Sequence, residues 1–108
     1  MEIKVLYFDG CPSWQKALIN LQKLINEENL DFLINLVEVK SDKEALKYKF
    51  LGSPSFQVNG QDLWPENREN FSMSCRVYST SNGLFGVPTD DMLRAKLIDI
   101  LNNKDKSK

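Results

Sequence analysis

Histidine is missing from this chain of 108 residues. Without an imidazole, the chain cannot build a Ser–His or Cys–His catalytic pair or an imidazole metal site. It also lacks the usual general base near neutral pH. A nucleophile in this protein must therefore be activated by its electrostatic surroundings.

Cysteine is nearly as scarce, with 2 residues, Cys11 and Cys75. They can form at most one bridge, which is too few for a secreted disulfide scaffold. Long apolar runs are absent too. Residues 1–8 are too short for the apolar region of a signal peptide, and no stretch approaches the roughly 20 apolar residues of a membrane helix. We expect a cytoplasmic protein, in a reducing compartment where a cysteine is more often reactive than structural.

The composition that remains is ordinary for one soluble globular domain, since 42% of the residues are apolar and 27% are charged. The chain has 14 basic and 15 acidic residues, so its net charge of −1 predicts no attraction to nucleic acid or to an anionic membrane. We therefore expect neither of these partners. We also expect no cofactor, and the oligomeric state stays open.

The order of predicted elements comes from periodicity and turn signals. The apolar run at 3–8 is typical of a strand buried on both faces, and Asp9-Gly10 breaks it. Pro12 marks a helix start, and Asn59-Gly60 marks a hairpin turn. The predicted segments are a strand at 3–8, a helix at 12–29, a strand at 31–39, a short helix between Ser41 and Gly52, strands at 55–58 and 61–64, and a last helix at 89–101.

Two segments fall outside these elements. Residues 65–88, called the excursion below, show little periodicity but contain apolar residues such as Phe71, which favours a packed segment over a loose linker. A small hairpin is predicted within the excursion, from Cys75 to Gly83. Residues 102–108 are predicted to be a frayed polar tail, so the domain is expected to span 1–101. The fold class that follows is α/β, in the order β-α-β-α-β-β-α with an insertion before the last helix.

Two short motifs carry a resemblance to a known family. Cys11-Pro12-Ser13-Trp14 directly follows the first predicted strand, and Gly52-Ser53-Pro54-Ser55 directly precedes the third. Together with the element order and the spacing between the motifs, they make nearly the whole chain resemble the thioredoxin superfamily. The resemblance implies a thioredoxin-like fold, a cis peptide bond at Pro54 facing Cys11, and a Ser53 backbone that pairs with a substrate strand.

A narrower resemblance rests on four segments: Tyr7-Phe8-Asp9-Gly10-Cys11-Pro12, Leu51-Gly52-Ser53-Pro54, Ser74-Cys75-Arg76-Val77-Tyr78 and Gly86-Val87-Pro88. These segments are similar to those of a group of small, largely uncharacterised bacterial thioredoxin-like proteins. Some members of that group carry a label that links them to organomercurial lyases.

The sequence departs from the thioredoxin pattern at Trp14, which stands where most disulfide oxidoreductases have their second cysteine. A resolving thiol three residues after Cys11 is therefore missing. The predicted topology starts the excursion at the Cys11 end of the sheet, so Cys75 becomes a candidate resolving thiol. Arg76 next to it would stabilise its thiolate. The alternative is a structural cysteine far from Cys11.

Cys11 is the candidate catalytic residue at the predicted helix start. Unpaired backbone N–H groups and the helix dipole favour a thiolate there. The alternative is a small buried apolar residue. Trp14 is either part of a substrate-binding surface with Ser53 and Pro54, or the first residue of the helix's apolar stripe.

Three functions remain open at this point. The first is thiol–disulfide exchange on a protein or small-molecule thiol or disulfide, in which Cys11 attacks and Cys75 resolves. The second is binding of a soft metal ion such as Hg(II) or Cu(I) by the two thiolates, or a lyase reaction with Asp9 as the acid. The third is a binding module without catalysis, which pairs a partner strand at the Pro54 edge.

Overall fold

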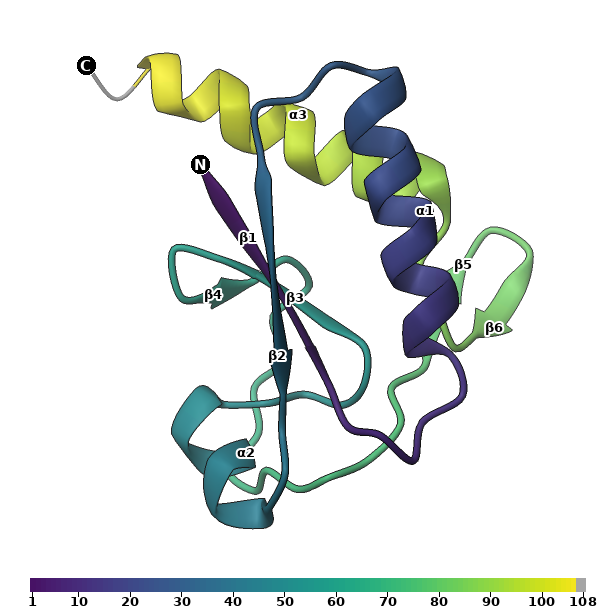
Figure 1. The fold of residues 1–108 in the computed structure, drawn as a ribbon, viewed down its shortest axis with the longest axis vertical. Helices are drawn as coiled ribbons and strands as arrows, with labels where there is room; N and C mark the ends of the chain where they lie inside the picture. The colour runs from purple at the N-terminus through teal and green to yellow at the C-terminus, as the bar shows by residue number, and fades with distance from the viewer. Residues whose placement is uncertain (107–108) are drawn as a thin grey trace.

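The central strand of the sheet is the first one in the chain. A computed structural model describes residues 1–106, and in it the sheet has the order β2-β1-β3-β4 (Figure 1). β1 runs parallel to β2 and antiparallel to β3, which pairs with β4. β1 pairs along both of its edges, and its residues Ile3, Val5 and Leu6 are fully buried because other elements pack on both of its faces. The strands of this sheet are β1 (Glu2–Tyr7), β2 (Leu33–Glu38), β3 (Ser55–Val58) and β4 (Gln61–Asp62).

The helices cover both faces of this sheet. α1 (Trp14–Glu27) and α3 (Asp90–Lys106) contribute to the core cluster that contains Ile3 and Val5 of β1. α2 (Asp42–Tyr48) contributes to a second cluster, built on Leu6 and Phe50. Since successive side chains of a strand point to opposite faces, α2 lies across the sheet from the other helices (Figure 1). The result is a single α/β domain on a mixed sheet, as the sequence predicted.

The turn signals locate two junctions correctly. Asn59 and Gly60 have φ of 54° and 79°, the positive values that a two-residue hairpin of type I′ requires. Ser41 caps α2, because its hydroxyl accepts a hydrogen bond of 3.1 Å from the Glu44 N–H. β4 is shorter than the predicted 61–64, since the N–H of Trp64 turns to the Asp62 carboxylate at 2.8 Å instead of continuing the strand pairing.

The structure corrects the boundaries of all three predicted helices. α1 begins at Trp14, two residues after the predicted Pro12. α2 ends at Tyr48, because Lys49 takes the left-handed conformation (φ 53°) that stops a helix before Gly52 is reached. α3 continues to Lys106 through most of the predicted tail. Once a helix has formed, each further residue adds a backbone hydrogen bond, so polar residues extend it. The last two residues of that tail lie outside the described part.

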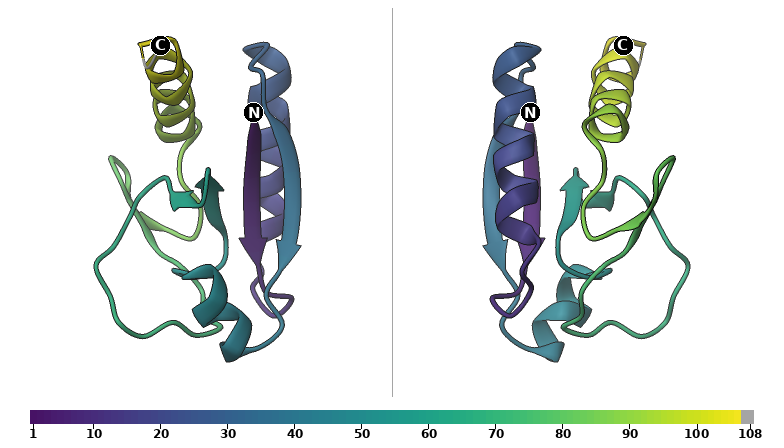
Figure 2. Two further views of the ribbon diagram at one scale, coloured as in Figure 1. Left: turned by 90° about the vertical axis from the view of Figure 1, so that its left-hand side faces the viewer. Right: turned by 90° about the vertical axis from the view of Figure 1, so that its right-hand side faces the viewer.

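The excursion runs from the end of the hairpin to α3. Figure 2 shows α1 against β1 and β2, with the excursion on the side of β3 and β4. It contains the pair β5 (Tyr78–Thr80) and β6 (Gly83–Phe85), so the predicted small hairpin exists but starts later than Cys75. Buried Arg76 and Tyr78 attach it to the body of the protein, as expected for a packed segment. Among the described helices, none has the length and apolar character needed to cross a membrane.

Candidate functional site

Ser53 is the residue at which distant parts of the chain meet. It is fully buried and precedes Pro54 through a cis peptide bond, as the resemblance implied. Its N–H donates to Ser74 O at 2.7 Å, and its carbonyl accepts from the Arg76 N–H at 3.0 Å. These two bonds pair Ser53 with Cys75 in a parallel bridge. The backbone that was expected to pair with a substrate strand is therefore already paired with the chain's own excursion.

Cys11 approaches Ser53 from the loop between β1 and α1. Its thiol donates a hydrogen bond to the Ser53 carbonyl oxygen at a distance of 3.2 Å, and only 2% of the residue is exposed. The same loop is tied down by the Phe8 N–H, which donates to Ser53 Oγ at 3.3 Å. α1 begins three residues after Cys11, and the hydrogen bond that the structure gives the sulfur goes to a carbonyl oxygen. The expected effect of the helix start on the Cys11 thiol stays a prediction.

Cys75 comes from the excursion, pairs with the Ser53 backbone and is exposed. Partial burial raises the pKa of its thiol, and the nearby Cys11 thiol raises that pKa further. The Cys11 thiol is therefore the ionisable group that affects the pKa of Cys75. The topological prediction that the excursion returns Cys75 to the Cys11 end of the sheet agrees with this placement.

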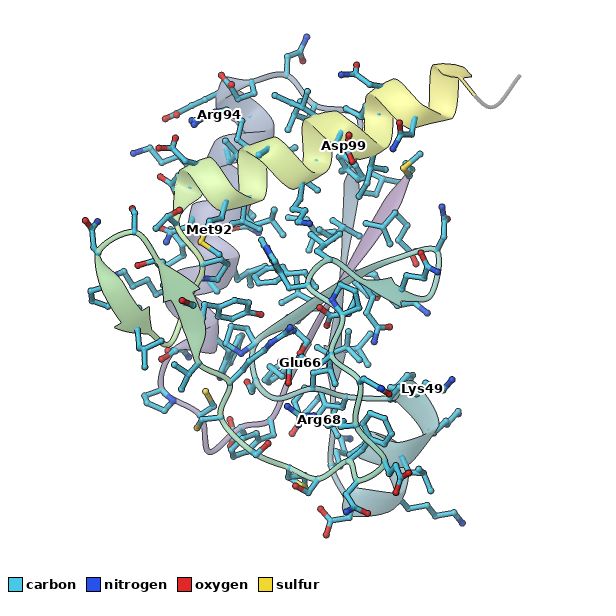
Figure 3. The ribbon with its side chains drawn as sticks, turned by 180° about the vertical axis from the view of Figure 1, so that it is seen from behind. Lys49, Glu66, Arg68, Met92, Arg94 and Asp99 are labelled. Atoms are coloured by element: carbon cyan, nitrogen blue, oxygen red, sulfur yellow. The ribbon has the colours of Figure 1, made fainter. Side chains whose placement is uncertain are left out.

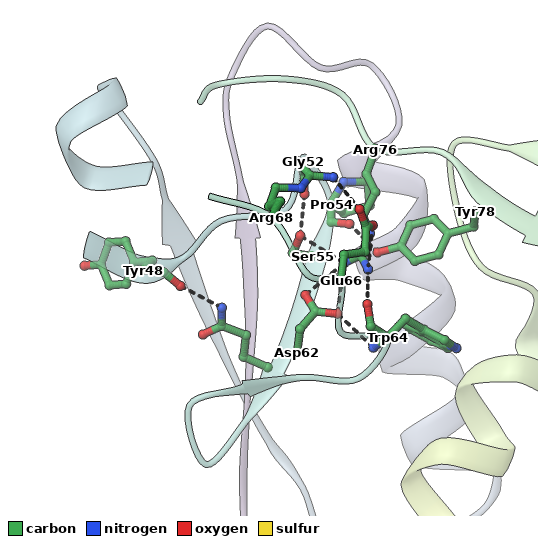
Figure 4. Close-up of polar contacts among 11 residues, drawn as sticks. Tyr48, Gly52, Pro54, Ser55, Asp62, Trp64, Glu66, Arg68, Arg76 and Tyr78 are labelled. Carbon is green, nitrogen blue, oxygen red and sulfur yellow. Dashed lines mark hydrogen bonds and ion pairs between the residues drawn. The ribbon is translucent and has the colours of Figure 1, made fainter. Parts of the chain in front are cut away.

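Arg76 holds the excursion in this position (Figure 4). Only 3% of its side chain is exposed, and its Nη1 donates to the two carboxylate oxygens of Asp62 at 3.0 and 2.8 Å. It also donates to Ser55 Oγ at 3.3 Å and to the Trp64 carbonyl oxygen. Burial raises the pKa of Asp62, and hydrogen bonding and charge from Arg76 oppose that rise.

The expectation that Arg76 stabilises a Cys75 thiolate is wrong. Adjacent side chains of an extended segment point to opposite sides. Cys75 faces outward, and Arg76 is directed inward to Asp62. The guanidinium therefore anchors the segment that carries Cys75, and its charge is paired with Asp62 rather than with the Cys75 sulfur.

Tyr78 and Gly52 complete the anchor. The Tyr78 hydroxyl donates to the Pro54 carbonyl oxygen, and its ring lies 4.7 Å from the Arg76 guanidinium carbon. Burial raises the pKa of Tyr78. Gly52 has a φ of +117°, and a Cβ at this position would lie 2.9 Å from Arg76 Cβ. Only glycine allows the excursion to approach the Pro54 loop this closely.

Sequence reasoning did not single out Asp62, Tyr78 or Gly52 as parts of the site. In the structure, exposed and buried residues alternate from Cys75 to Tyr78. The sequence does not signal this alternation, because apolar Val77 is exposed and charged Arg76 is buried. Nothing in the sequence pairs Asp62 with Arg76, since the pairing depends on the course of the excursion in space.

Trp14, the first residue of α1, lies outside the core clusters. It is half-buried, and its ring stacks on Tyr7 with a centroid separation of 4.0 Å. The buried stripe of α1 begins one turn later and consists of Ala17, Leu21 and Leu24. Asp9 is exposed next to this pair. Burial raises the pKa of Tyr7, and the charges of Glu38 and Asp9 add to that effect.

A separate cavity of about 340 Å³ lies where the excursion passes α2. Lys49, Glu66 and Arg68 are among the residues that line it, and Figure 3 shows these three side chains. Neither cysteine is among the residues that line it. Within the described chain, no group of three or more His, Cys, Asp or Glu side chains could hold a metal ion. A metal at Cys11 and Cys75 would thus have the two sulfurs as its only such ligands.

Comparison with known proteins adds no relative: no family model, no curated protein and no solved structure matches this chain.

Proposed function

We propose that this protein is a thioredoxin-like thiol–disulfide exchange protein in which Cys11 and Cys75 form the redox pair. The observation that carries the proposal is that both cysteines flank one residue. Cys11 donates its thiol hydrogen to Ser53 O, and Cys75 is bridged to the Ser53 backbone. Two thiols placed on the same residue by separate segments can be joined by a small local movement.

The exchange reaction explains how Trp14 can replace a second cysteine without loss of chemistry. A substrate disulfide accepts two electrons and is released as two thiols. The protein dithiol loses the same two electrons and becomes a Cys11–Cys75 disulfide, which an external thiol then reduces. The excursion thus supplies the second sulfur that a Cys-x-x-Cys motif supplies within one helical turn.

The thioredoxin-like assignment of the fold belongs to the same proposal. It is supported by the element order, by the cis bond before Pro54 and by the proximity of Cys11 to Ser53. It rests on these local features and on the resemblance of the two motifs.

The direct test is the redox state of the two cysteines. The protein is equilibrated in glutathione buffers of graded potential, free thiols are trapped with an alkylating agent, and intact masses are measured. We expect a reversible loss of two hydrogens that maps to a Cys11–Cys75 link and is absent in Cys75→Ala. Free thiols on both residues in the most oxidising buffer would contradict the proposal.

A second candidate is the binding of a soft metal ion between the two thiolates. Sulfur ligands select ions such as Hg(II) and Cu(I), and a pair of them without further ligands suits linear coordination. The placement of both cysteines at Ser53 favours this candidate. Titration of the reduced protein with Hg(II), followed by its ultraviolet thiolate absorption, should saturate at one ion. Saturation unchanged in Cys75→Ala would eliminate a two-thiolate site.

The lyase version of this candidate has less support. A lyase needs an acid at the reacting carbon, and Asp9 is the only residue proposed for it. Asp9 is exposed, and the titrating group that it affects is Tyr7 rather than either cysteine. We therefore carry forward only the binding of the ion.

A further inference from the structure

The two sulfurs of the proposed pair differ in accessibility. Cys11 is 2% exposed, and its thiol is engaged with the Ser53 carbonyl oxygen. Cys75 is exposed. A disulfide in solution can therefore reach Cys75 at the surface, whereas Cys11 is buried.

The segment that carries Cys75 binds the same Ser53 carbonyl oxygen that accepts from the Cys11 thiol. Residues 74–76 occupy the Ser53 backbone through hydrogen bonds of 2.7 and 3.0 Å. Arg76 fixes this segment by its ion pair with Asp62. A substrate that reached Cys11 by pairing with Ser53 would first have to break these contacts. A substrate that reacts at Cys75 leaves all of them intact.

We propose that Cys75 is the thiol that attacks the substrate disulfide and that Cys11 is the thiol that resolves the product. This inference rests on the proposed function and names the order of its two steps. The order is the reverse of the one that the sequence alone suggested, in which the cysteine after the first strand attacks.

The first step forms one sulfur–sulfur bond and breaks another. The Cys75 thiol loses its proton to solvent and attacks one sulfur of the substrate disulfide. A mixed disulfide forms on Cys75, and the other half of the substrate leaves as a thiolate that takes up a proton.

In the second step the Cys11 thiol gives up the proton that it donated to Ser53 O. Its sulfur attacks Cys75, forms the Cys11–Cys75 disulfide and expels the remaining half of the substrate as a thiol. The substrate disulfide has then gained two electrons and the protein has lost two.

The order also indicates the kind of substrate. The Ser53 N–H and carbonyl are both occupied, so this residue cannot take an extended peptide as an added strand. Attack at Cys75 needs no such pairing. A low-molecular-weight disulfide such as glutathione disulfide satisfies this geometry.

The first test uses the unmodified, reduced protein. A limiting amount of iodoacetamide is added at neutral pH, and the first alkylated site is identified by peptide mass mapping. The raised pKa of Cys75 lowers the fraction of its thiolate, but access differs far more between the two residues, since Cys75 is exposed and Cys11 is 2% exposed. We therefore expect Cys75 to be labelled at least roughly tenfold faster than Cys11. Equal labelling, or faster labelling of Cys11, overturns the proposed order. Neither result depends on the folding of a variant.

The second test follows the intermediate with glutathione disulfide. In Cys11→Ser, the resolving sulfur is absent, so a stable glutathione adduct should accumulate on Cys75. In the matched Cys75→Ser variant, only buried Cys11 remains, and adduct formation should be at least roughly tenfold slower. Circular dichroism of both variants checks that they are folded. A faster adduct on Cys11 in folded Cys75→Ser contradicts the proposal.

The two proposals fail in distinguishable ways. If the wild-type protein forms the Cys11–Cys75 bridge but Cys11 reacts first, the order is wrong and the exchange function stands. If Cys75 reacts first but no bridge forms with glutathione disulfide, the exchange function fails, and the order of attack fails with it.

Discussion

The two segments that meet at Ser53 are held in place by partly different forces. The loop that carries Cys11 continues directly from β1, and Phe8 in this loop packs against the second core cluster. The segment that carries Cys75 also packs on the core, through Phe71 and Tyr78, but in addition it depends on the buried guanidinium of Arg76 and its polar partners. Both cysteines therefore rely on core packing, and a buried ion pair is added only in the segment that carries Cys75. Substitutions that remove the contacts of Arg76 should displace Cys75 and leave Cys11 where it is.

Arg76→Leu is expected to lower the free energy of unfolding more than any other substitution considered below. It leaves the buried Asp62 carboxylate without its partner, and breaking a buried pair from one side costs about 3–5 kcal/mol. Urea denaturation should show this loss of stability. Hydrogen exchange at the Ser53 amide should become faster, while exchange in β1 follows global unfolding alone.

The matched control is Arg68→Leu. Arg68 also pairs with a carboxylate, that of Glu66, and both side chains are substantially exposed, 35% and 42%. Glu66 lies 3.5 Å from Arg76 Nη2 as well, and Arg68→Leu leaves the Arg76 contacts in place. An exposed pair contributes less than about 1 kcal/mol, so the control should remain close to the wild type. Equal losses in the two variants would mean that the buried pair does not anchor the excursion.

Gly52→Ala should have the next largest effect. The added Cβ requires a strained φ of +117° and lies 2.9 Å from Arg76 Cβ, so we expect a loss of about 1–3 kcal/mol. Gly60→Ala is the control for backbone strain alone, because Gly60 has a φ of +79° and no atom within 4 Å of the added Cβ. Denaturation midpoints of the two variants separate the steric contact from the strain. Identical losses would show that the close approach of Arg76 contributes nothing.

Tyr78→Phe removes one hydroxyl and keeps the ring. The buried Pro54 carbonyl loses its donor, which should lower the free energy of unfolding by about 1–2 kcal/mol. Tyr48→Phe is the control, because Tyr48 accepts a hydrogen bond from Gln57 with its backbone carbonyl, which the substitution keeps. That variant should stay within about 0.5 kcal/mol of the wild type. If Tyr78→Phe leaves the free energy of unfolding unchanged, the Tyr78 hydroxyl does not help to hold the excursion.

The smallest expected effect is a shift in the pH dependence of Cys75 alkylation. Burial and the Cys11 thiol raise the pKa of Cys75, so its thiolate forms at higher pH than that of an ordinary free cysteine. The rate of alkylation should therefore rise with pH and level off only above the usual thiol pKa. In Cys11→Ala the contribution of the neighbouring thiol is lost, and the midpoint should move to lower pH. An unchanged midpoint would mean that the two thiols do not interact.

The element order was predictable from the sequence because its signals are local. Periodicity placed the strands and helices, and Asn59-Gly60 placed the hairpin. Local signals were less accurate at helix ends: Pro12 predicted the start of the first helix, but α1 begins at Trp14. Helix boundaries depend on the contacts of each end as well as on the residues themselves.

The candidate site divides in the same way. The sequence by itself determined that Cys11 follows a buried strand and that Pro54 precedes another, because both positions are set by adjacent apolar runs and turns. Only the tertiary structure decided that Cys75 pairs with Ser53 and that Arg76 is directed inward to Asp62. These contacts join residues far apart in the chain, and their partners are chosen by the course of the excursion across β3 and β4. The same course brings an exposed Cys75 and a buried Cys11 to one residue, Ser53.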